Sequence, residues 1–156
     1  MPRLEDITHF NTVADHGLAL SEEQLPPNTI IHMDDLPWTG FIDPRTNQPN
    51  PHVFTRFLLP DRHRYSASLI WHEPGFSSSP HWHPSDTLYI VKSGELHVKG
   101  EGVYRPGDYR WVRGGTAYDA EQGGSEPLET FLISFGPAGR FDADLHPAPN
   151  CDFRKK

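Results

Sequence analysis

The stretch from His52 to Phe135 is divided into short apolar runs by glycine, proline and aspartate, and this pattern limits the possible fold more than any other feature. The expected strands are 53–59, 65–72, 87–92, 95–99, 103–104, 109–113 and 128–135, with an earlier strand at 29–33 and a long loop at 34–51. Short strands at intervals of about 8–12 residues, separated by turn residues, are typical of antiparallel sandwiches and barrels. We therefore predict an all-β domain.

The 156 residues suffice for one domain with its own core. Sixteen prolines and thirteen glycines favour many short strands over long helices. We expect an N-terminal arm over residues 1–28, a barrel over 29–136, and a C-terminal tail over 137–156 that packs on the barrel or trails from it. We expect this arm to wrap either the barrel or a second copy, and its length together with strand edges that need covering predicts a homodimer.

The charge balance limits the possible partners. Lys and Arg total 14 against 21 Asp and Glu, for a formal charge of −7, and no basic stripe is present, so nucleic acid is not an expected partner. No apolar run approaches the roughly 18 residues of a membrane span, so no membrane partner is expected. The first ten residues lack an apolar signal core, and Cys151 is the only cysteine. We expect a cytoplasmic protein without an intrachain disulfide.

The most specific chemical signal lies between Gly75 and Gly94, where His81 and His83 stand two residues apart. In a strand, side chains at i and i+2 point to the same face, so both imidazoles are expected to enter one space. Two neutral imidazoles on one face can begin a site for iron, zinc, nickel or manganese. We predict that both histidines are metal ligands.

This stretch resembles the first signature of the cupin superfamily, in which glycine, His-x-His, glutamate and glycine follow at set spacings. Gly75, His81, His83 and Gly94 fall in register, and Thr87 stands where the glutamate is usual. The resemblance covers about residues 65–136. It implies a double-stranded β-helix, or jelly-roll barrel.

The second cupin signature is also recognisable. Gly107 and Gly115 are in register, while Arg113, Tyr118 and Gln122 stand at the proline, histidine and asparagine positions. Two of the four metal ligands usual in the family are therefore retained as histidines. Tyr118 stands at the position of a third.

Three roles remain open for Tyr118. It can complete the metal site as a phenolate, since a bound cation offsets the usual phenol pKa near 10. It can instead transfer a proton as a catalytic residue, or it can be a structural tyrosine with a satisfied hydroxyl. Asp86 is a further carboxylate near Thr87, but it has the wrong strand parity, and we interpret it as a loop cap.

A substrate pocket is expected around the metal site. Its predicted lining residues are Thr87, Tyr89, Trp111, Arg113 and Phe131. The resemblance implies an enzyme acting on a small molecule through an open divalent-metal site, with dioxygenase, lyase or isomerase chemistry. The alternative is a cupin that binds or senses a small ligand without catalysis and with no need of a metal.

Overall fold

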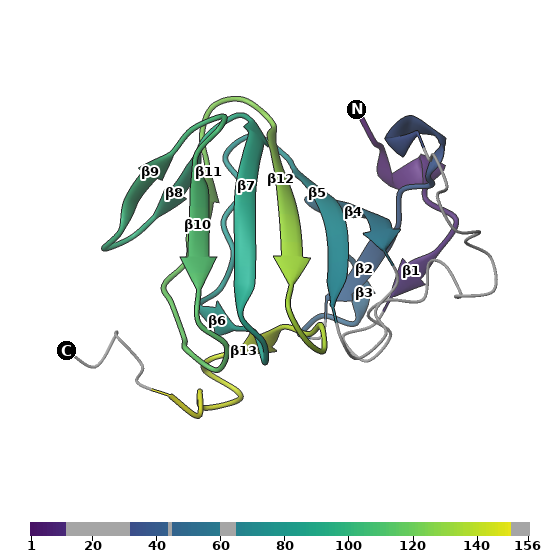
Figure 1. Ribbon diagram of the computed structural model, residues 1–156. Coiled ribbons are helices and arrows are strands. Elements are labelled where there is room, and N and C mark those ends of the chain that lie inside the picture. Colours follow the sequence, from purple (N-terminus) through teal and green to yellow (C-terminus); the bar gives the residue numbers. More distant parts are fainter. Residues whose placement is uncertain (12–31, 44, 60–64, 151–156) are drawn as a thin grey trace.

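The computed structural model describes residues 1–11, 32–43, 45–59 and 65–150 (Figure 1). Its strands are β1 (Phe10–Asn11), β2 (Gly40–Asp43), β3 (Gln48–Pro49), β4 (Val53–Leu59), β5 (Ser66–His72), β6 (His81–Trp82), β7 (Thr87–Ser93), β8 (Leu96–Val98), β9 (Gly102–Tyr104), β10 (Tyr109–Val112), β11 (Glu121–Gly123), β12 (Leu128–Ser134) and β13 (Phe141–Asp142). Two 3-10 helices, η1 (Leu4–Asp6) and η4 (Met33–Asp35), also lie in these ranges. Neither is long and apolar enough to cross a membrane, nor is any other helix in the described part of the chain.

Five antiparallel strands form the main sheet, in the order β10-β7-β12-β5-β4. A second sheet has the order β11-β8-β9, and β6 pairs with β13 below the main sheet (Figure 1). The all-β fold predicted from the strand pattern is thus confirmed, and the arrangement agrees with the jelly-roll barrel that the resemblance implies.

Alternation along the strands gives the main sheet an inner and an outer face. Tyr89 and Val91 on β7 are buried and point inward, whereas the intervening Ile90 points outward. Val91 packs against Leu96 and Leu128 in a fully buried apolar cluster. This cluster joins the main sheet to β8 and leaves the region around Tyr89 for polar groups.

The N-terminal residues cover part of the outer face. Ile7 is buried against Phe54 on β4 and Trp71 on β5, with Phe10 and Trp38 packed around them. The rings of Phe54 and Trp71 stack with centres 5.6 Å apart. The start of the predicted arm is therefore folded onto the barrel at the β4 side.

Glycine is needed where β7 turns into β8. Gly94 has a φ of +74°, which L side chains rarely adopt. A Cβ atom there would also lie 2.9 Å from the Cα atom of Leu128, inside van der Waals contact. The closing glycine of the first signature therefore allows β12 to pass close to the turn.

The structure differs from the expected strands in several places. The expected loop at 34–51 contains β2 and β3, and the short strands β11 and β13 were not predicted. Of the expected strand at 29–33, residues 29–31 lie outside the described ranges, and Met33 begins η4. The unpredicted strands are two to four residues long, so long-range pairing rather than a local pattern creates them.

Candidate functional site

His81 and His83 lie side by side inside the barrel. His81 begins β6 and pairs with Tyr118 in an isolated antiparallel bridge, with backbone N···O distances of 3.3 and 3.1 Å. Both histidines are buried, with 2% and 6% of their surface exposed, and the ring centres are 5.3 Å apart. The i, i+2 spacing therefore brings both imidazoles into one space, as predicted.

A backbone carbonyl fixes each imidazole. Nδ1 of His81 donates to the carbonyl oxygen of Ser79 at 2.8 Å, and Nδ1 of His83 donates to that of Gly139. Because a carbonyl oxygen only accepts, Nδ1 carries the proton in both rings and Nε2 presents a lone pair. Metal-binding histidines are oriented in the same way.

The two Nε2 lone pairs meet two buried tyrosine hydroxyls. The hydroxyl of Tyr118 lies 2.7 Å from Nε2 of His81, and that of Tyr89 lies 2.9 Å from Nε2 of His83. The two hydroxyl oxygens are 2.5 Å apart. Three contacts thus join four atoms, but with neutral imidazoles only two hydroxyl protons are available for them. One of the three contacts therefore has no proton of its own.

A buried ion pair closes the cluster on the side of β10 and β11. Arg110 donates to Glu121 at 3.0 Å and to both carboxylate oxygens of Glu101 at 2.5 and 2.6 Å. Its guanidinium carbon lies 4.2 Å from the ring centre of Tyr118. The second oxygen of Glu121 is 3.7 Å from Nε2 of His81. Glu121 therefore places a carboxylate beside the histidine pair. The sequence pattern did not predict this residue.

Burial and neighbouring charges set the protonation states. Burial, followed by the charge of Arg140, lowers the pKa of His81 well below its usual value. Burial and the negative charge of Glu121 raise the pKa of Tyr118 well above the usual value, and the same causes raise the pKa of Tyr89. Burial also raises the pKa of Glu121, although its guanidinium partner opposes this. At neutral pH the tyrosines are hydrogen-bond donors and His81 is an acceptor.

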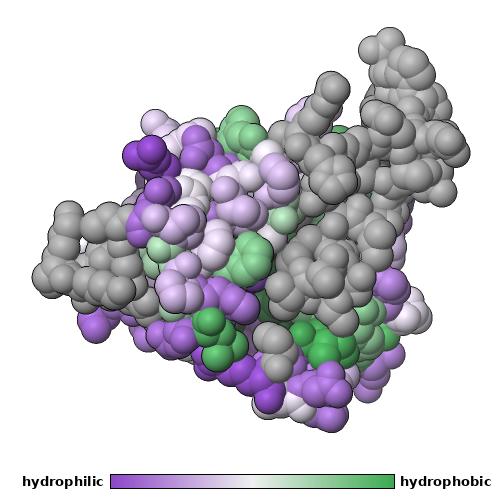
Figure 2. Space-filling view, turned by 90° about the horizontal axis from the view of Figure 1, so that it is seen from below, coloured by the Kyte–Doolittle hydropathy of each residue, from purple (hydrophilic) through white to green (hydrophobic). Residues whose placement is uncertain are grey.

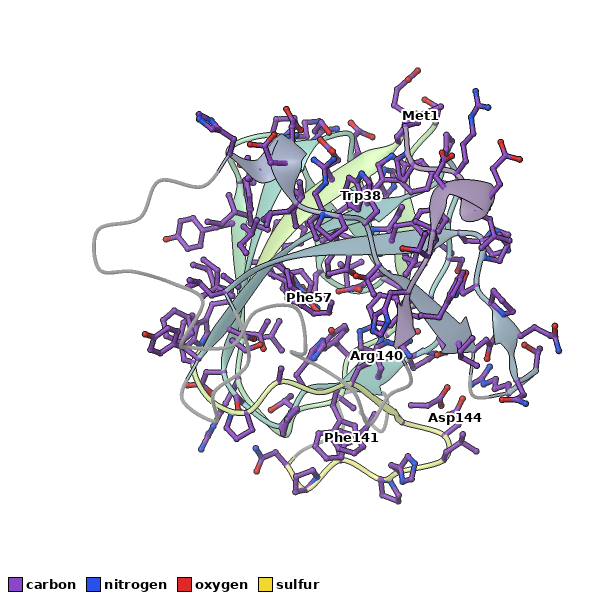
Figure 3. The ribbon with its side chains drawn as sticks, turned by 90° about the vertical axis from the view of Figure 1, so that its right-hand side faces the viewer. Met1, Trp38, Phe57, Arg140, Phe141 and Asp144 are labelled. Carbon is purple, nitrogen blue, oxygen red and sulfur yellow. The ribbon has the colours of Figure 1, made fainter. Side chains whose placement is uncertain are left out.

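The C-terminal segment brings a second guanidinium to the histidines. Nη2 of Arg140 donates to Oγ of Ser79 at 3.0 Å and lies 3.4 Å from Nδ1 of His81. In Figure 3, Arg140 extends toward the middle of the molecule, whereas Phe141 and Asp144 lie at its edge. Among the residues that the structure describes, no carboxylate lies within ion-pair distance of Arg140.

Thr87 and Asp86 do not complete the histidine pair. Thr87 is fully buried, and its hydroxyl donates to the carbonyl oxygen of Ser85 at 3.0 Å. The carboxylate of Asp86 accepts the backbone N–H of Gly114 at 2.8 Å, which is the loop-cap role expected for it. The carboxylate near the histidines comes instead from Glu121 on β11.

The residues predicted to line a substrate pocket were Thr87, Tyr89, Trp111, Arg113 and Phe131. Only the first two point into the barrel. Trp111 is 54% exposed on the outer face, and Arg113 is exposed just after β10. Phe131 lies opposite the outward Ile90. This corrects the expected placement, because Arg110 and not Trp111 takes the inward position on β10.

Three buried polar atoms on the inner face have no hydrogen-bond partner within the described ranges. They are Nδ1 of His72 and the hydroxyls of Thr55 and Thr130. Both threonines lie opposite Ile70 in the strand pairing, so they flank one row of the sheet. Burial and the charge of Arg140 lower the pKa of His72 to about 3. Such atoms are usually satisfied by water or a ligand.

A pocket of about 470 Å³ lies apart from this cluster, beside the N-terminal residues. Trp38, Arg56 and Trp71 line part of it. The guanidinium of Arg56 lies 4.4 Å from the Trp38 ring centre and pairs with Asp34 at 2.8 Å. The pocket shares no lining residue with the histidine cluster.

The donor set fits a mixed nitrogen and oxygen metal site. Across the described ranges, no three His, Cys, Asp or Glu side chains are grouped to hold a metal ion. The donors that converge are Nε2 of His81 and His83 and the hydroxyls of Tyr118 and Tyr89, with Glu121 beyond them. A tyrosine in such a site binds as phenolate, which a cation makes accessible.

A scan against known protein families finds no match, and no curated protein matches the sequence. Solved structures do resemble it. An RmlC-like cupin protein from Ralstonia eutropha has a TM-score of 0.55 at 18% identity, covering 69% of this chain and 68% of that one. A sugar phosphate isomerase from a cupin superfamily, from Silicibacter pomeroyi, has a TM-score of 0.57 at 18% identity, covering 74% and 82%. A polyketide cyclase from Streptomyces resistomycificus has a TM-score of 0.54 at 15% identity, covering 78% and 89%.

Similarity at these identities concerns the fold alone, and a fold hosts many reactions. It agrees with the jelly-roll strand order and with the resemblance carried by the two glycine- and histidine-containing signatures. The chain is therefore a protein of the cupin fold.

Proposed function

We propose that this protein is a small-molecule enzyme of the cupin type that holds a divalent transition-metal ion with His81, His83 and Tyr118. The observation that carries the proposal is the convergence of two Nε2 lone pairs, each ring being held through Nδ1 by a backbone carbonyl. Neutral imidazole suits zinc, iron and nickel, and oxygen donors extend the range to manganese.

The proton count of the cluster supports a bound cation. The contact between the hydroxyls of Tyr89 and Tyr118 has no proton of its own when both hydroxyls donate to histidines. A cation on the imidazole lone pairs would free the hydroxyl of Tyr89 to donate to Tyr118, and it would favour ionisation of Tyr118 against the raised pKa that burial gives its hydroxyl. Glu121, 3.7 Å from His81, is the nearest additional oxygen donor.

A bound divalent ion would polarise a substrate oxygen or acidify a water molecule. Tyr118 would then have a second role, because the hydroxyl of Tyr89 lies 2.5 Å from its phenol oxygen and can donate to it when the ion occupies both Nε2 atoms. The two tyrosines together could take up or return a proton at the substrate. Proton transfer beside a polarised oxygen suits isomerase or lyase chemistry better than it suits oxygen insertion.

The inner face also suggests the character of the substrate. Arg140 brings a positive charge to the histidine pair, and no described carboxylate forms a direct ion pair with it. The unsatisfied atoms of His72, Thr55 and Thr130 can bond hydroxyl or carbonyl oxygens. A small organic anion that carries such oxygens matches these groups.

Elemental analysis of protein purified without chelator tests the metal site. We expect close to one transition-metal ion per chain, lost in a His81→Ala/His83→Ala double variant. His97→Ala is the matched control, because His97 lies on β8 with its side chain 40% exposed and bonds Glu95. Unchanged metal content in the double variant contradicts the proposal, as does absence of metal from the wild type after reloading.

A second candidate is a cupin that binds a ligand without turnover. The observation that favours it is burial, since His81, His83 and Tyr118 expose at most 6% of their surface. A bound ligand raises the melting temperature by mass action. Compounds that raise it should be followed by mass spectrometry. Conversion of a stabilising compound supports the enzyme, and stabilisation without conversion supports the binding protein.

A further inference from the structure

The outer face of β10, β7 and β12 carries a continuous apolar patch. In the strand pairing, Leu88 lies opposite both Trp111 and Ile133. Ile90 likewise lies opposite Tyr109 and Phe131. Directly opposed residues of antiparallel strands place their side chains on the same face. The outer-face patch consists of Leu88, Ile90, Tyr109, Trp111, Phe131, Ile133 and Phe135.

Three aromatic residues of the patch are largely exposed. Tyr109 is 71% exposed, Trp111 54% and Phe135 53%, and the rings of the last two are 5.4 Å apart. With about 150–250 Å² per aromatic side chain, these three expose roughly 270–450 Å² together. That alone approaches the largest apolar patch of a typical monomer, about 300–600 Å².

The described structure leaves this patch uncovered. The N-terminal residues pack on the same side of the sheet, but over Phe54 and Trp71 on β4 and β5. Figure 1 looks onto the sheet, and none of its labelled elements crosses in front of β10, β7 and β12. On the described part of the lower face, by contrast, hydrophobic residues lie in small groups among hydrophilic ones (Figure 2).

We propose that two copies of this chain associate through the outer-face patch about a two-fold axis. A standard interface takes about 800 Å² from each partner, and the three exposed aromatics supply a third to a half of this. The four half-buried aliphatic and aromatic residues around them and the polar rim supply the remainder. Trp and Tyr are also enriched among the residues that contribute most to binding.

Charge selects a second copy as the occupant. The chain carries a formal charge of −7, so two copies repel each other through most of their surfaces. The outer-face patch contains no ionisable acid or base other than the Tyr109 hydroxyl, and at its rim Lys92 pairs with Glu129. Two-fold symmetry makes the patch meet itself, which requires a surface without net charge. The patch meets that requirement.

The histidine cluster lies on the opposite side of the sheet, so the dimer does not depend on the proposed metal site. Tyr89 points inward from β7 while Ile90, the next residue, points outward into the patch. Disrupting the interface is therefore expected to leave the metal content unchanged. Removing the metal is expected to leave the dimer intact.

Light scattering coupled to size-exclusion chromatography tests the proposal. We expect the wild type to have about twice the 17.7 kDa mass of the chain across a wide concentration range. Trp111→Glu and Tyr109→Glu, which place a negative charge in the patch, should shift the mass to that of one chain. Leu145→Glu is the matched control, because Leu145 is 60% exposed on the C-terminal segment. It should remain dimeric.

Circular dichroism and metal content should match the wild type in all three variants, since each substitution is at an exposed side chain. A monomeric wild type overturns the proposal. It would mean that a different partner, or another part of the same chain, covers the patch. A dimer that survives both Trp111→Glu and Tyr109→Glu also overturns it.

Discussion

The hydroxyl oxygens of Tyr89 and Tyr118 lie 2.5 Å apart, and each also contacts Nε2 of a histidine. Tyr118 comes from a loop that pairs with β6, and Tyr89 comes from β7. The contact therefore connects two separate parts of the barrel, and its energy can be measured by removing one hydroxyl at a time.

Tyr118→Phe and Tyr89→Phe are each expected to destabilise metal-free protein by about 1–3 kcal/mol, because each leaves a buried Nε2 without its donor. The double variant should cost less than the two single changes combined, with a coupling of about 0.5–3 kcal/mol. Urea denaturation measures all three. Tyr109→Phe, at an exposed tyrosine, is the control and should stay close to the wild type. Additive costs would show that the two hydroxyls do not interact.

The histidine pair could be predicted because its information is local. An i, i+2 spacing places two side chains on one face wherever the chain is extended. The shared orientation of His81 and His83 follows from this spacing alone. The long strands β4, β5, β7 and β12 were readable for the same reason, since alternation and turn residues mark them. Tyr118 was identified through the spacing of a family signature and not through its own surroundings.

Glu121, Arg110 and Arg140 could not be predicted, because their positions depend on contacts between distant segments. Glu121 lies on a three-residue strand in a glycine-rich stretch without alternation. Arg140 reaches Ser79 from 61 residues away, through a polar segment that gave no strand signal. For β10, the sequence pattern predicted that Trp111 points inward, because apolar residues usually face the core. In the structure the charged Arg110 is buried there instead.

Arg110→Met should destabilise the protein by about 3–5 kcal/mol, because it leaves the buried carboxylate of Glu121 without its cation. Arg113→Met is the matched control, since Arg113 is exposed three residues further on, and it should stay close to the wild type. Chemical denaturation gives both values. An Arg110→Met variant as stable as the control would mean that Glu121 is uncharged in the folded protein.

Gly94→Ala and Gly100→Ala separate a conformational cost from a steric one. Both glycines have positive φ, but only at Gly94 would a Cβ meet backbone, at Pro127 and Leu128. Gly100→Ala should cost about 1–2 kcal/mol for the left-handed conformation alone. Gly94→Ala should cost about 1–3 kcal/mol more, since the facing backbone of Pro127 and Leu128 leads into β12 and has little freedom to move. Equal unfolding midpoints for the two variants would show that β12 does not sterically constrain this turn.

His72 gives the protein a pH dependence that can be isolated. Burial and the charge of Arg140 lower the pKa of this imidazole from 6.5 to about 3 in the folded state. Between these values the unfolded chain binds a proton that the folded protein does not. The free energy of unfolding therefore falls as the pH falls from 6.5 toward 3, by up to about 1.4 kcal/mol per pH unit from this group.

His72→Gln removes that group, so the stability difference between wild type and variant should shrink steadily as the pH is lowered through this window. Above pH 6.5 the difference should be constant, because His72 is then neutral in both states. His9→Gln is the control for removing a histidine at an exposed site. Urea denaturation at a series of pH values, in the presence of chelator, measures each curve. Parallel curves for wild type and His72→Gln would mean that this imidazole is protonated as readily in the folded barrel as in the unfolded chain.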